Sequence, residues 1–376
     1  MNTMSTTLPA GLITLADHEA HAHHTLDANA WAYFSGGAAD EFTLHANPRA
    51  WNQWQLLPRV LRPLAGGHSR VQLLGRTLAH PIMLAPVAYQ RMAHPDGEIA
   101  TALAAAAQQA GLILSTQAST PLEDVADAIR DDPERGPLWL QLYLQADRGH
   151  TLELVQRAER AGYEALVLTV DAPTHGARDR ERRAHFRLPA GISAVNLAGF
   201  GAAPAPQGSH PLFDGLLTHA PTWDDVAWLQ TQTRLPLLLK GILHPDDARQ
   251  AAALQVAGVV VSNHGGRTLD TTPATAVMLP RIADAVQGTL ALLVDGGIRR
   301  GTDVLKAIAL GASAVLVGRP YIHGLAHAGA LGVAHVLRLL RDELDIAMAL
   351  SGCRTLADAQ RSLLLPASPS ADNPAC

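Results

Sequence analysis

The sequence predicts an α/β fold, a TIM (β/α)8 barrel, and two observations lead to this prediction. From residue 81 onward, short apolar runs alternate with Ala- and charge-rich stretches of about three helical turns that close at glycine. This alternation is typical of βα units and a parallel sheet, and eight such units close a barrel. The expected strands are residues 81–86, 112–115, 138–144, 165–170, 236–240, 257–261, 290–294 and 313–317.

Three further segments are additions to this barrel. We expect residues 1–80 to form an N-terminal helical extension that ends in a hairpin, VQLLGRTL, against the N-terminal face of the barrel. About sixty-five residues separate the fourth and fifth strands, including FGAAPAPQGSHPLFDG. So long a loop after strand 4 is usually functional or mobile. A single domain is expected over residues 1–365, followed by a disordered tail over residues 366–376.

Composition excludes several classes of protein. The net charge of −5 gives no basic field that would attract nucleic acid. The only two cysteines, Cys353 and Cys376, give no disulfide framework, and no apolar run reaches the roughly 18 residues of a membrane span. The first thirty residues lack the pattern of a secretory leader. We therefore expect a soluble, cytoplasmic protein that binds neither nucleic acid nor a membrane.

Polar residues occur at the C-terminal ends of five consecutive predicted strands, where α/β barrels bind their ligands. In the third strand, LWLQLYL, a period of two places Gln141 and Tyr143 on the same face. Any one of these polar groups could be a satisfied core residue. Five strands with the same feature at the same end favour a site. Its members are Gln141, Tyr143, Thr169, Asp171, Lys240, Ser262, His264 and Asp295.

The segment VVVSNHGGRTLD, residues 259–270, is the most informative of these strand ends. The three valines indicate a strand that is buried on both faces, so His264 and Arg267 follow its C-terminal end. An imidazole can take a proton, and a guanidinium can bind a carboxylate through two parallel hydrogen bonds. The segment thus predicts a place where a proton and a carboxylate are handled together.

Glycines after the last two strands form a second cluster, in LLVDGGIRRG and VLVGRP. Loops at this position commonly bind a phosphate through exposed backbone N–H groups. Arg299 and Arg319 would add charged contacts. Glycine also closes tight turns, but the joint position of the two loops favours a phosphate-bearing cofactor.

These motifs, together with DGGIRRGTDVLKA, LGASAVLVGRP, QLYLQADR and LVLTVDAP, make the chain resemble the FMN-dependent α-hydroxy acid oxidases and dehydrogenases, such as glycolate oxidase and L-lactate oxidase. The resemblance spans nearly the whole chain, because AYFSGGAADEFTLHANPRAW and RDELDIAMALSGCRTL also match. It implies FMN as the cofactor and a homo-oligomer, a tetramer or an octamer.

The resemblance also implies a role for each matching residue. His264 would be the active-site base, Asp171 its partner, and Lys240 a cation beside flavin N1 and the C2 carbonyl. The implied substrate contacts are Tyr33, Tyr143, Arg178, His264 and Arg267, with both arginines at the carboxylate. The implied cofactor contacts are Pro86, Val87, Ala88, Ser115, Gln141, Tyr143, Thr169, Lys240, Ser262, Asp295, Gly296, Gly297, Arg299, Gly318 and Arg319.

Three positions depart from the glycolate oxidase pattern and bear on the substrate. Gln117 stands where that enzyme has a pocket tryptophan, His175 replaces a leucine of the mobile loop, and Tyr89 lies beside the flavin in APVAYQ. We expect all three to face the substrate. The matching residues therefore indicate the reaction type, and these three leave the identity of the substrate open.

The expected reaction is oxidation of an (S)-2-hydroxy acid to the 2-oxo acid, with O2 as acceptor and hydrogen peroxide as product. His264 would remove either the hydroxyl proton or the α-proton, and Asp171 should raise its pKa by pairing with the imidazolium. One alternative is a soluble dehydrogenase that passes electrons to a quinone. Others are an FMN-dependent isomerase, such as the type 2 isopentenyl diphosphate isomerases, and a flavin-binding protein without activity.

Four histidines cluster in DHEAHAHH: His18, His21, His23 and His24. They could be interpreted as a metal site. A solvated face of a helix is the simpler interpretation, and no metal enters the expected chemistry.

Overall fold

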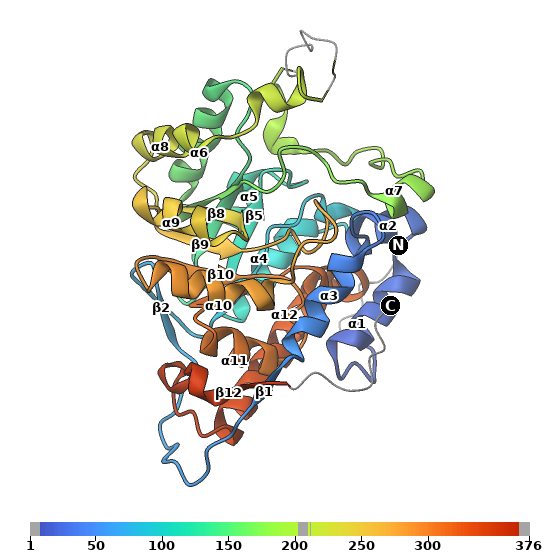
Figure 1. The fold of residues 1–376 in the computed structure, drawn as a ribbon. Helices are drawn as coiled ribbons and strands as arrows, with labels where there is room; N and C mark the ends of the chain where they lie inside the picture. Colours follow the sequence, from blue (N-terminus) through green and yellow to red (C-terminus); the bar gives the residue numbers. More distant parts are fainter. Residues whose placement is uncertain (1–7, 202–209, 211, 368–376) are drawn as a thin grey trace.

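The structure is a computed structural model and describes residues 8–201, 210 and 212–367. Eight parallel strands form a closed barrel, in which each strand pairs with the next in sequence and the last pairs with the first (Figure 1). They are β4 (Ile82–Leu84), β5 (Gly111–Ser115), β6 (Leu138–Leu142), β7 (Ala165–Thr169), β8 (Leu237–Ile242), β9 (Gly258–Val261), β10 (Ala291–Val294) and β11 (Ala314–Val317). The predicted TIM barrel is confirmed, and every predicted strand end lies within two residues of the observed one.

A helix follows each barrel strand and packs outside it (Figure 1). Helix α6 shows how the sequence determines where such a helix begins and ends. The side chain of Asp147 caps its N-terminus by accepting from the Gly149 amide, and Gly162 ends it at a φ of +87°. The helices are α4 (Gly97–Ala107), α5 (Leu122–Asp127), α6 (Arg148–Ala161), α8 (Trp223–Gln232), α9 (Pro245–Ala253), α10 (Thr275–Val286), α11 (Gly301–Ala309) and α12 (Arg319–Leu350).

The N-terminal extension is helical, as predicted, and lies against one side of the barrel (Figure 1). It contains α1 (Leu15–Thr25), α2 (Ala28–Ser35) and α3 (Phe42–Trp51), followed by β1 (Trp54–Leu56). Strand β1 pairs with β12 (Leu364–Pro366), and the Ala367 amide donates to the Gln53 carbonyl. The first two residues of the predicted tail are thus held by the extension, and residues 368–376 lie outside the described residues.

The predicted hairpin consists of β2 (Val71–Leu73) and β3 (Arg76–Leu78). Leu73 and Leu78 belong to the same buried cluster as the inward-facing side chains at the lower end of the barrel. That cluster is separate from the larger core between the strands and the outer helices. The hairpin therefore closes the barrel at its N-terminal end. The barrel members are Met83, Ala85, Ile113, Trp139, Ala165, Val167, Leu238, Val260, Leu293, Ala314 and Leu316.

Between β7 and α8, the described residues of the long connection contain one short helix, α7 (Asp179–Arg183), and two 3-10 turns, Val195–Leu197 and Leu216–His219. Asn196 anchors it, because its buried side-chain oxygen accepts from the Leu122 amide at 2.9 Å and from Arg157 at 3.1 Å. Residues 202–209 and 211 of the predicted mobile segment lie outside the described residues.

Across residues 8–201 and 212–367, every helix is too short or too polar to cross a membrane.

Candidate active site

A cavity of about 1040 Å³ lies at the C-terminal end of the barrel. All the predicted site residues except Asp171 and Ser262 line it, and these two bond to residues that do. The lining members are Tyr33, Pro86, Val87, Ala88, Tyr89, Ser115, Gln117, Gln141, Tyr143, Thr169, His175, Arg178, Lys240, His264, Arg267, Asp295, Gly296, Gly297, Arg299, Gly318 and Arg319. The structure therefore brings the whole predicted set together.

His264 and Asp171 form a pair at the centre of the site. The His264 Nδ1 atom lies 2.8 Å from Asp171 Oδ1, and the His264 amide donates to Ser262 Oγ at 3.0 Å. Gly241 permits the approach, since a Cβ at that position would lie 2.4 Å from the Asp171 Cβ. The Asp171 Oδ2 atom is buried and has no hydrogen-bond partner within the described chain.

Burial and Asp171 act in opposite directions on the pKa of His264. Burial lowers it below its usual value and outweighs Asp171, which acts in the opposite direction. Asp171 thus raises the pKa of His264 as predicted, and burial makes the net shift a fall. Burial would raise the pKa of Asp171, but His264 and Lys240 bring it below its usual value. Asp171 thus remains a carboxylate and His264 a neutral imidazole near neutral pH.

Lys240 lies in β8 beside two polar residues that follow β9 and β10, Ser262 and Asp295. Its Nζ donates to Ser262 Oγ at 3.0 Å and lies 3.4 Å from Asp295 Oδ2, while Ser262 Oγ donates to the same Asp295 oxygen at 2.8 Å. Burial alone would lower the pKa of Lys240, but Asp295 and Asp171 raise it above its usual value. The cavity floor therefore carries a permanent ammonium.

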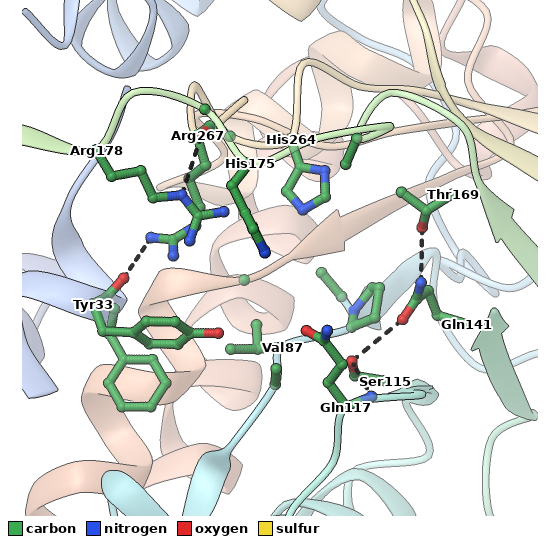
Figure 2. Close-up of a pocket in the computed structure, with 18 of the residues that line it drawn as sticks. Tyr33, Val87, Ser115, Gln117, Gln141, Thr169, His175, Arg178, His264 and Arg267 are labelled. Atoms are coloured by element: carbon green, nitrogen blue, oxygen red, sulfur yellow. Dashed lines mark hydrogen bonds between the residues drawn. The ribbon is translucent and has the colours of Figure 1, made fainter. Parts of the chain in front are cut away.

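A chain of hydrogen bonds orients the Gln141 amide. Ser115 Oγ donates to its Oε1 at 3.2 Å, and its Nε2 donates to Thr169 Oγ1 at 3.0 Å (Figure 2). The three residues stand at the ends of the consecutive strands β5, β6 and β7. One edge of the floor is thus a fixed row of donors and acceptors.

Two arginines converge on the cavity from different segments. Arg267 donates to the backbone oxygens of Tyr33 and Gly36, and its guanidinium lies 5.0 Å from the centre of the Tyr33 ring. Arg178 Nε donates to the Arg267 carbonyl at 3.4 Å (Figure 2). The cavity thus contains a paired cationic site of the kind that binds a carboxylate.

Glu181 is a member of this site that the sequence analysis missed. Its Oε1 atom lies 3.1 Å from Arg178 Nη1 and 3.3 Å from Arg267 Nη2. The spacing of Arg178 and Glu181, three residues apart in ARDRERR, was the available signal. The contact to Arg267, 86 residues away, gave none.

The glycine loops also line the cavity, next to two partly buried arginines, Arg299 and Arg319. Arg319 donates to the carbonyls of Gly265 and Gly36 at 2.9 and 2.8 Å, while its buried Nε has no partner within the described residues. Burial, with help from Arg267 and Arg299, lowers the pKa of Arg319 to about 9. A concentration of positive charge with a free donor is a site for an anion.

Gly297 has a second reason to be glycine. Its φ is +83°, and a Cβ there would lie 2.4 Å from the Asn47 carbonyl carbon. The loop after β10 therefore packs directly on α3, and glycine at this position serves packing as well as any phosphate contact.

Tyr89, Gln117 and His175 also line the cavity. The Tyr89 amide donates to the Gln117 carbonyl at 3.2 Å, which joins the loops after β4 and β5. His175 enters from the loop after β7, and Figure 2 shows it pointing into the cavity towards Gln117. The loops after β4, β5 and β7 thus form one polar wall of the cavity, made of Tyr89, Gln117 and His175.

Glu98 is a second residue that the sequence analysis missed, and it supports the loops of this wall. It is fully buried at the start of α4 and accepts from the amides of Gln90 and Ser119 at 3.1 and 2.8 Å and from Thr120 Oγ1 at 2.8 Å. Its carboxylate thus ties the segments that carry Tyr89 and Gln117.

The N-terminal histidines lie outside this cavity, on α1. His21, His23 and His24 are exposed, but His18 is fully buried, so the prediction of a solvated face is wrong for His18. With Leu15 and Ala22 it forms the buried side of α1, and its ring nitrogens lie 2.8 Å from His327 and 2.9 Å from His335 of α12. Within the described residues, no group of three or more His, Cys, Asp or Glu side chains has the geometry of a metal site.

Comparisons with known proteins agree with this geometry. A curated L-lactate oxidase from Alicycliphilus denitrificans is 49% identical over 96% of this chain and 98% of its own. The 2-hydroxyacid oxidase 1 of Homo sapiens is 42% identical over 94% and 96% of the two chains, and the glycolate oxidase of Spinacia oleracea 41% over 92% and 94%. These similarities extend over nearly the full length of the chain.

Solved structures give the same result. The crystal structure of a mandelate oxidase with (S)-2-phenylpropionate superposes with a TM-score of 0.84 and 43% identity, covering 94% of this chain and 98% of that one. The family described as FMN-dependent dehydrogenase matches residues 22–366, and this match confirms the expected cofactor, FMN. The chain belongs to the FMN-dependent dehydrogenase family.

Proposed function

We propose that the chain oxidises an (S)-2-hydroxy acid to the 2-oxo acid, with FMN as cofactor and O2 as electron acceptor, which yields hydrogen peroxide. The observation that carries the proposal is the presence in one cavity of a neutral His264 paired with Asp171 and of the arginine pair Arg178 and Arg267. The names of the relatives, L-lactate, glycolate and 2-hydroxyacid oxidases, support an oxidase over a quinone-linked dehydrogenase.

The residues of the cavity fit FMN. Arg319 has a buried donor without a partner, and Asp295 has a buried acceptor, Oδ1, without one among the residues described. We propose that Arg299, Arg319, Gly296, Gly297 and Gly318 hold the phosphate end. The ring end would meet Pro86, Val87, Ala88, Ser115, Gln141, Tyr143, Thr169, Lys240 and Ser262. When bound, FMN accepts the two electrons that leave the substrate.

The substrate carboxylate would lie on Arg178 and Arg267, with Tyr33 and Tyr143 donating further hydrogen bonds. Burial raises the pKa of Tyr33 to about 12 and raises that of Tyr143 as well, so both hydroxyls keep their protons. His264 would then take a proton from the substrate, either from the hydroxyl or from the α-carbon, and both routes use the same residues. Asp171 would hold the imidazolium that results.

The other end of the substrate would face Tyr89, Gln117 and His175. This wall suits a small to medium side chain of the lactate type. We further propose a single domain over residues 1–365, a cytoplasmic location, and a homotetramer or an octamer.

The test is anaerobic flavin reduction with a panel of glycolate, both lactate enantiomers, 2-hydroxybutyrate, longer 2-hydroxy acids and mandelate. We expect (S)-lactate or a near relative to bleach the flavin and its enantiomer to leave it unchanged. The same panel in air should release one hydrogen peroxide per turnover. Flavin that no member of the panel reduces would contradict the proposal, and reduction without peroxide would favour the dehydrogenase.

A further inference from the structure

Glu181 places a negative charge inside the cationic site proposed for the substrate carboxylate. One oxygen, Oε1, lies within 3.3 Å of both Arg178 Nη1 and Arg267 Nη2, and all three side chains are no more than 16% exposed. Glu181 also lines the cavity. The carboxylate is therefore built into the site and is not a solvated partner at its rim.

Arg180 and Arg182 of α7 pair with other carboxylates, although Arg182 also lines the cavity. Arg180 pairs with Glu41 of the N-terminal extension, and Arg182 pairs with Asp179 at 3.2 Å, where the two side chains are 71% and 34% exposed. Of the five residues of this helix, Glu181 alone contacts both arginines within the described structure.

Four other groups beside the two arginines are neutral. Tyr33 and Tyr143 keep their protons, and burial lowers the pKa of His175 and of His264 below the usual value. Lys240 interacts with Asp295 and Asp171, and Arg319 is a further cation near Arg267. Within the described residues, Glu181 is the one carboxylate paired with Arg178 and Arg267, and it reduces the combined charge of these two guanidinium groups from two positive units to one.

We propose that Glu181 is a specificity-determining residue that sets this charge, so that the site favours monoanionic 2-hydroxy acids over dianionic ones. The inference rests on the proposed function, because it takes the arginine pair as the place of the substrate carboxylate. Coulomb energy scales with the product of the charges, so the Glu181 carboxylate disfavours a dianion about twice as strongly, in free energy, as a monoanion at the same place. The charge of the Glu181 carboxylate alone thus gives selectivity for monoanions over dianions.

The test is isothermal titration calorimetry of the oxidised holoenzyme at pH 7.5 with pyruvate, a monoanion, and oxalate, a dianion. Glu181→Gln keeps an oxygen that can accept from both arginines but removes the charge. We expect the variant to bind pyruvate about threefold and oxalate about tenfold more tightly than wild type, the second factor being about the square of the first. Binding is measured without turnover.

Two variants serve as matched controls. Glu181→Asp keeps the charge, and Asp179→Asn removes one from the same helix outside the cavity, so both should leave the pyruvate-to-oxalate affinity ratio within about twofold of wild type. Glu181→Ala removes the same charge with different packing and should shift the ratio in the same direction as Glu181→Gln, which guards against a folding defect in either variant.

If Glu181→Gln changed the affinity for the two anions equally, or weakened the binding of both, the inference would be overturned. Glu181 would then only hold the two arginines in position. Failure of the proposed function gives a different result. In that case, wild-type holoenzyme would bind neither anion, and no 2-hydroxy acid would reduce its flavin.

Discussion

The interior of the barrel has two halves that the same strands build from residues only two positions apart. Trp139, Val167 and Leu238 point into the lower half, where they belong to one apolar cluster and the β2–β3 hairpin closes the end. Two residues further along the same strands, Gln141, Thr169 and Lys240 line the floor of the cavity. Side chains two residues apart on a strand share a face. Two residues along each strand therefore separate the apolar core from the floor of the cavity.

The two halves differ in polarity and also in whether their buried polar atoms have hydrogen-bond partners. In the lower half, no member of the apolar cluster has a buried polar side-chain atom without a partner within the described residues. In the upper half, Asp171, Asp295 and Arg319 each keep a buried polar atom without a partner in the described chain. Unsatisfied buried groups cost free energy, so the upper half is organised for ligands and the lower half for stability.

A substitution in the lower half should give the largest effect on stability. Trp139→Ala removes a side chain that is 2% exposed and leaves a cavity in the apolar cluster. We expect the free energy of unfolding to fall by about 3–5 kcal/mol, measured by urea denaturation of the apoprotein. The folded fraction should still bind FMN, and a loss of flavin binding at unchanged stability would break the distinction between the halves.

In the upper half, His264→Gln should affect chemistry and spare the fold. The side chain is 21% exposed and pairs with Asp171, and glutamine cannot act as a base. The rate of anaerobic flavin reduction should drop at least about 100-fold while the flavin stays bound and the melting temperature stays near that of wild type. Near-normal reduction would remove His264 from the role of base.

His18 is a buried polar group away from both halves, and it should respond to pH as a structural residue. Burial lowers its pKa to about 3 from the usual 6.5, so the folded protein excludes a proton that the unfolded chain binds. Its contribution is therefore complete above pH 6.5 and is lost as the pH falls towards 3, by about 1.4 kcal/mol per pH unit.

The measurement is the free energy of unfolding between pH 7 and pH 4.5 for wild type and His18→Gln. The variant should be less stable at pH 7 and should show a shallower loss of stability in acid. His24→Gln, an exposed change on the same helix, should follow the wild-type slope. Parallel slopes for all three proteins would contradict the assignment.

How far the sequence predicts each region depends on how local its causes are. The strands and the polar strand ends follow from a period of two, and the motif around His264 is contiguous, so the barrel and the floor of the cavity were predictable. Glu181 contacts Arg267 across 86 residues, and His18 contacts His327 across 309, so only the tertiary structure reveals these pairs. The net pKa shift of His264 depends on burial, which no motif encodes.

The smallest effect should come from moving the boundary between the halves by one residue. Ser115→Ala extends the apolar part of β5, whose preceding inward residue is Ile113. The Gln141 oxygen loses the Ser115 hydroxyl at 3.2 Å but still accepts from the Thr116 amide at 3.2 Å, while the Gln117 amide loses the Ser115 oxygen at 3.1 Å. The hydrogen bond that orients Gln141 is worth about 0.5–1.5 kcal/mol, so we expect FMN to dissociate about two- to tenfold more readily. Fluorescence titration of the apoprotein with FMN measures this change, and the melting temperature of the apoprotein should stay unchanged. A fall in stability as large as that of Trp139→Ala would mean that the polar floor, too, is needed for folding, and that the two halves are one core.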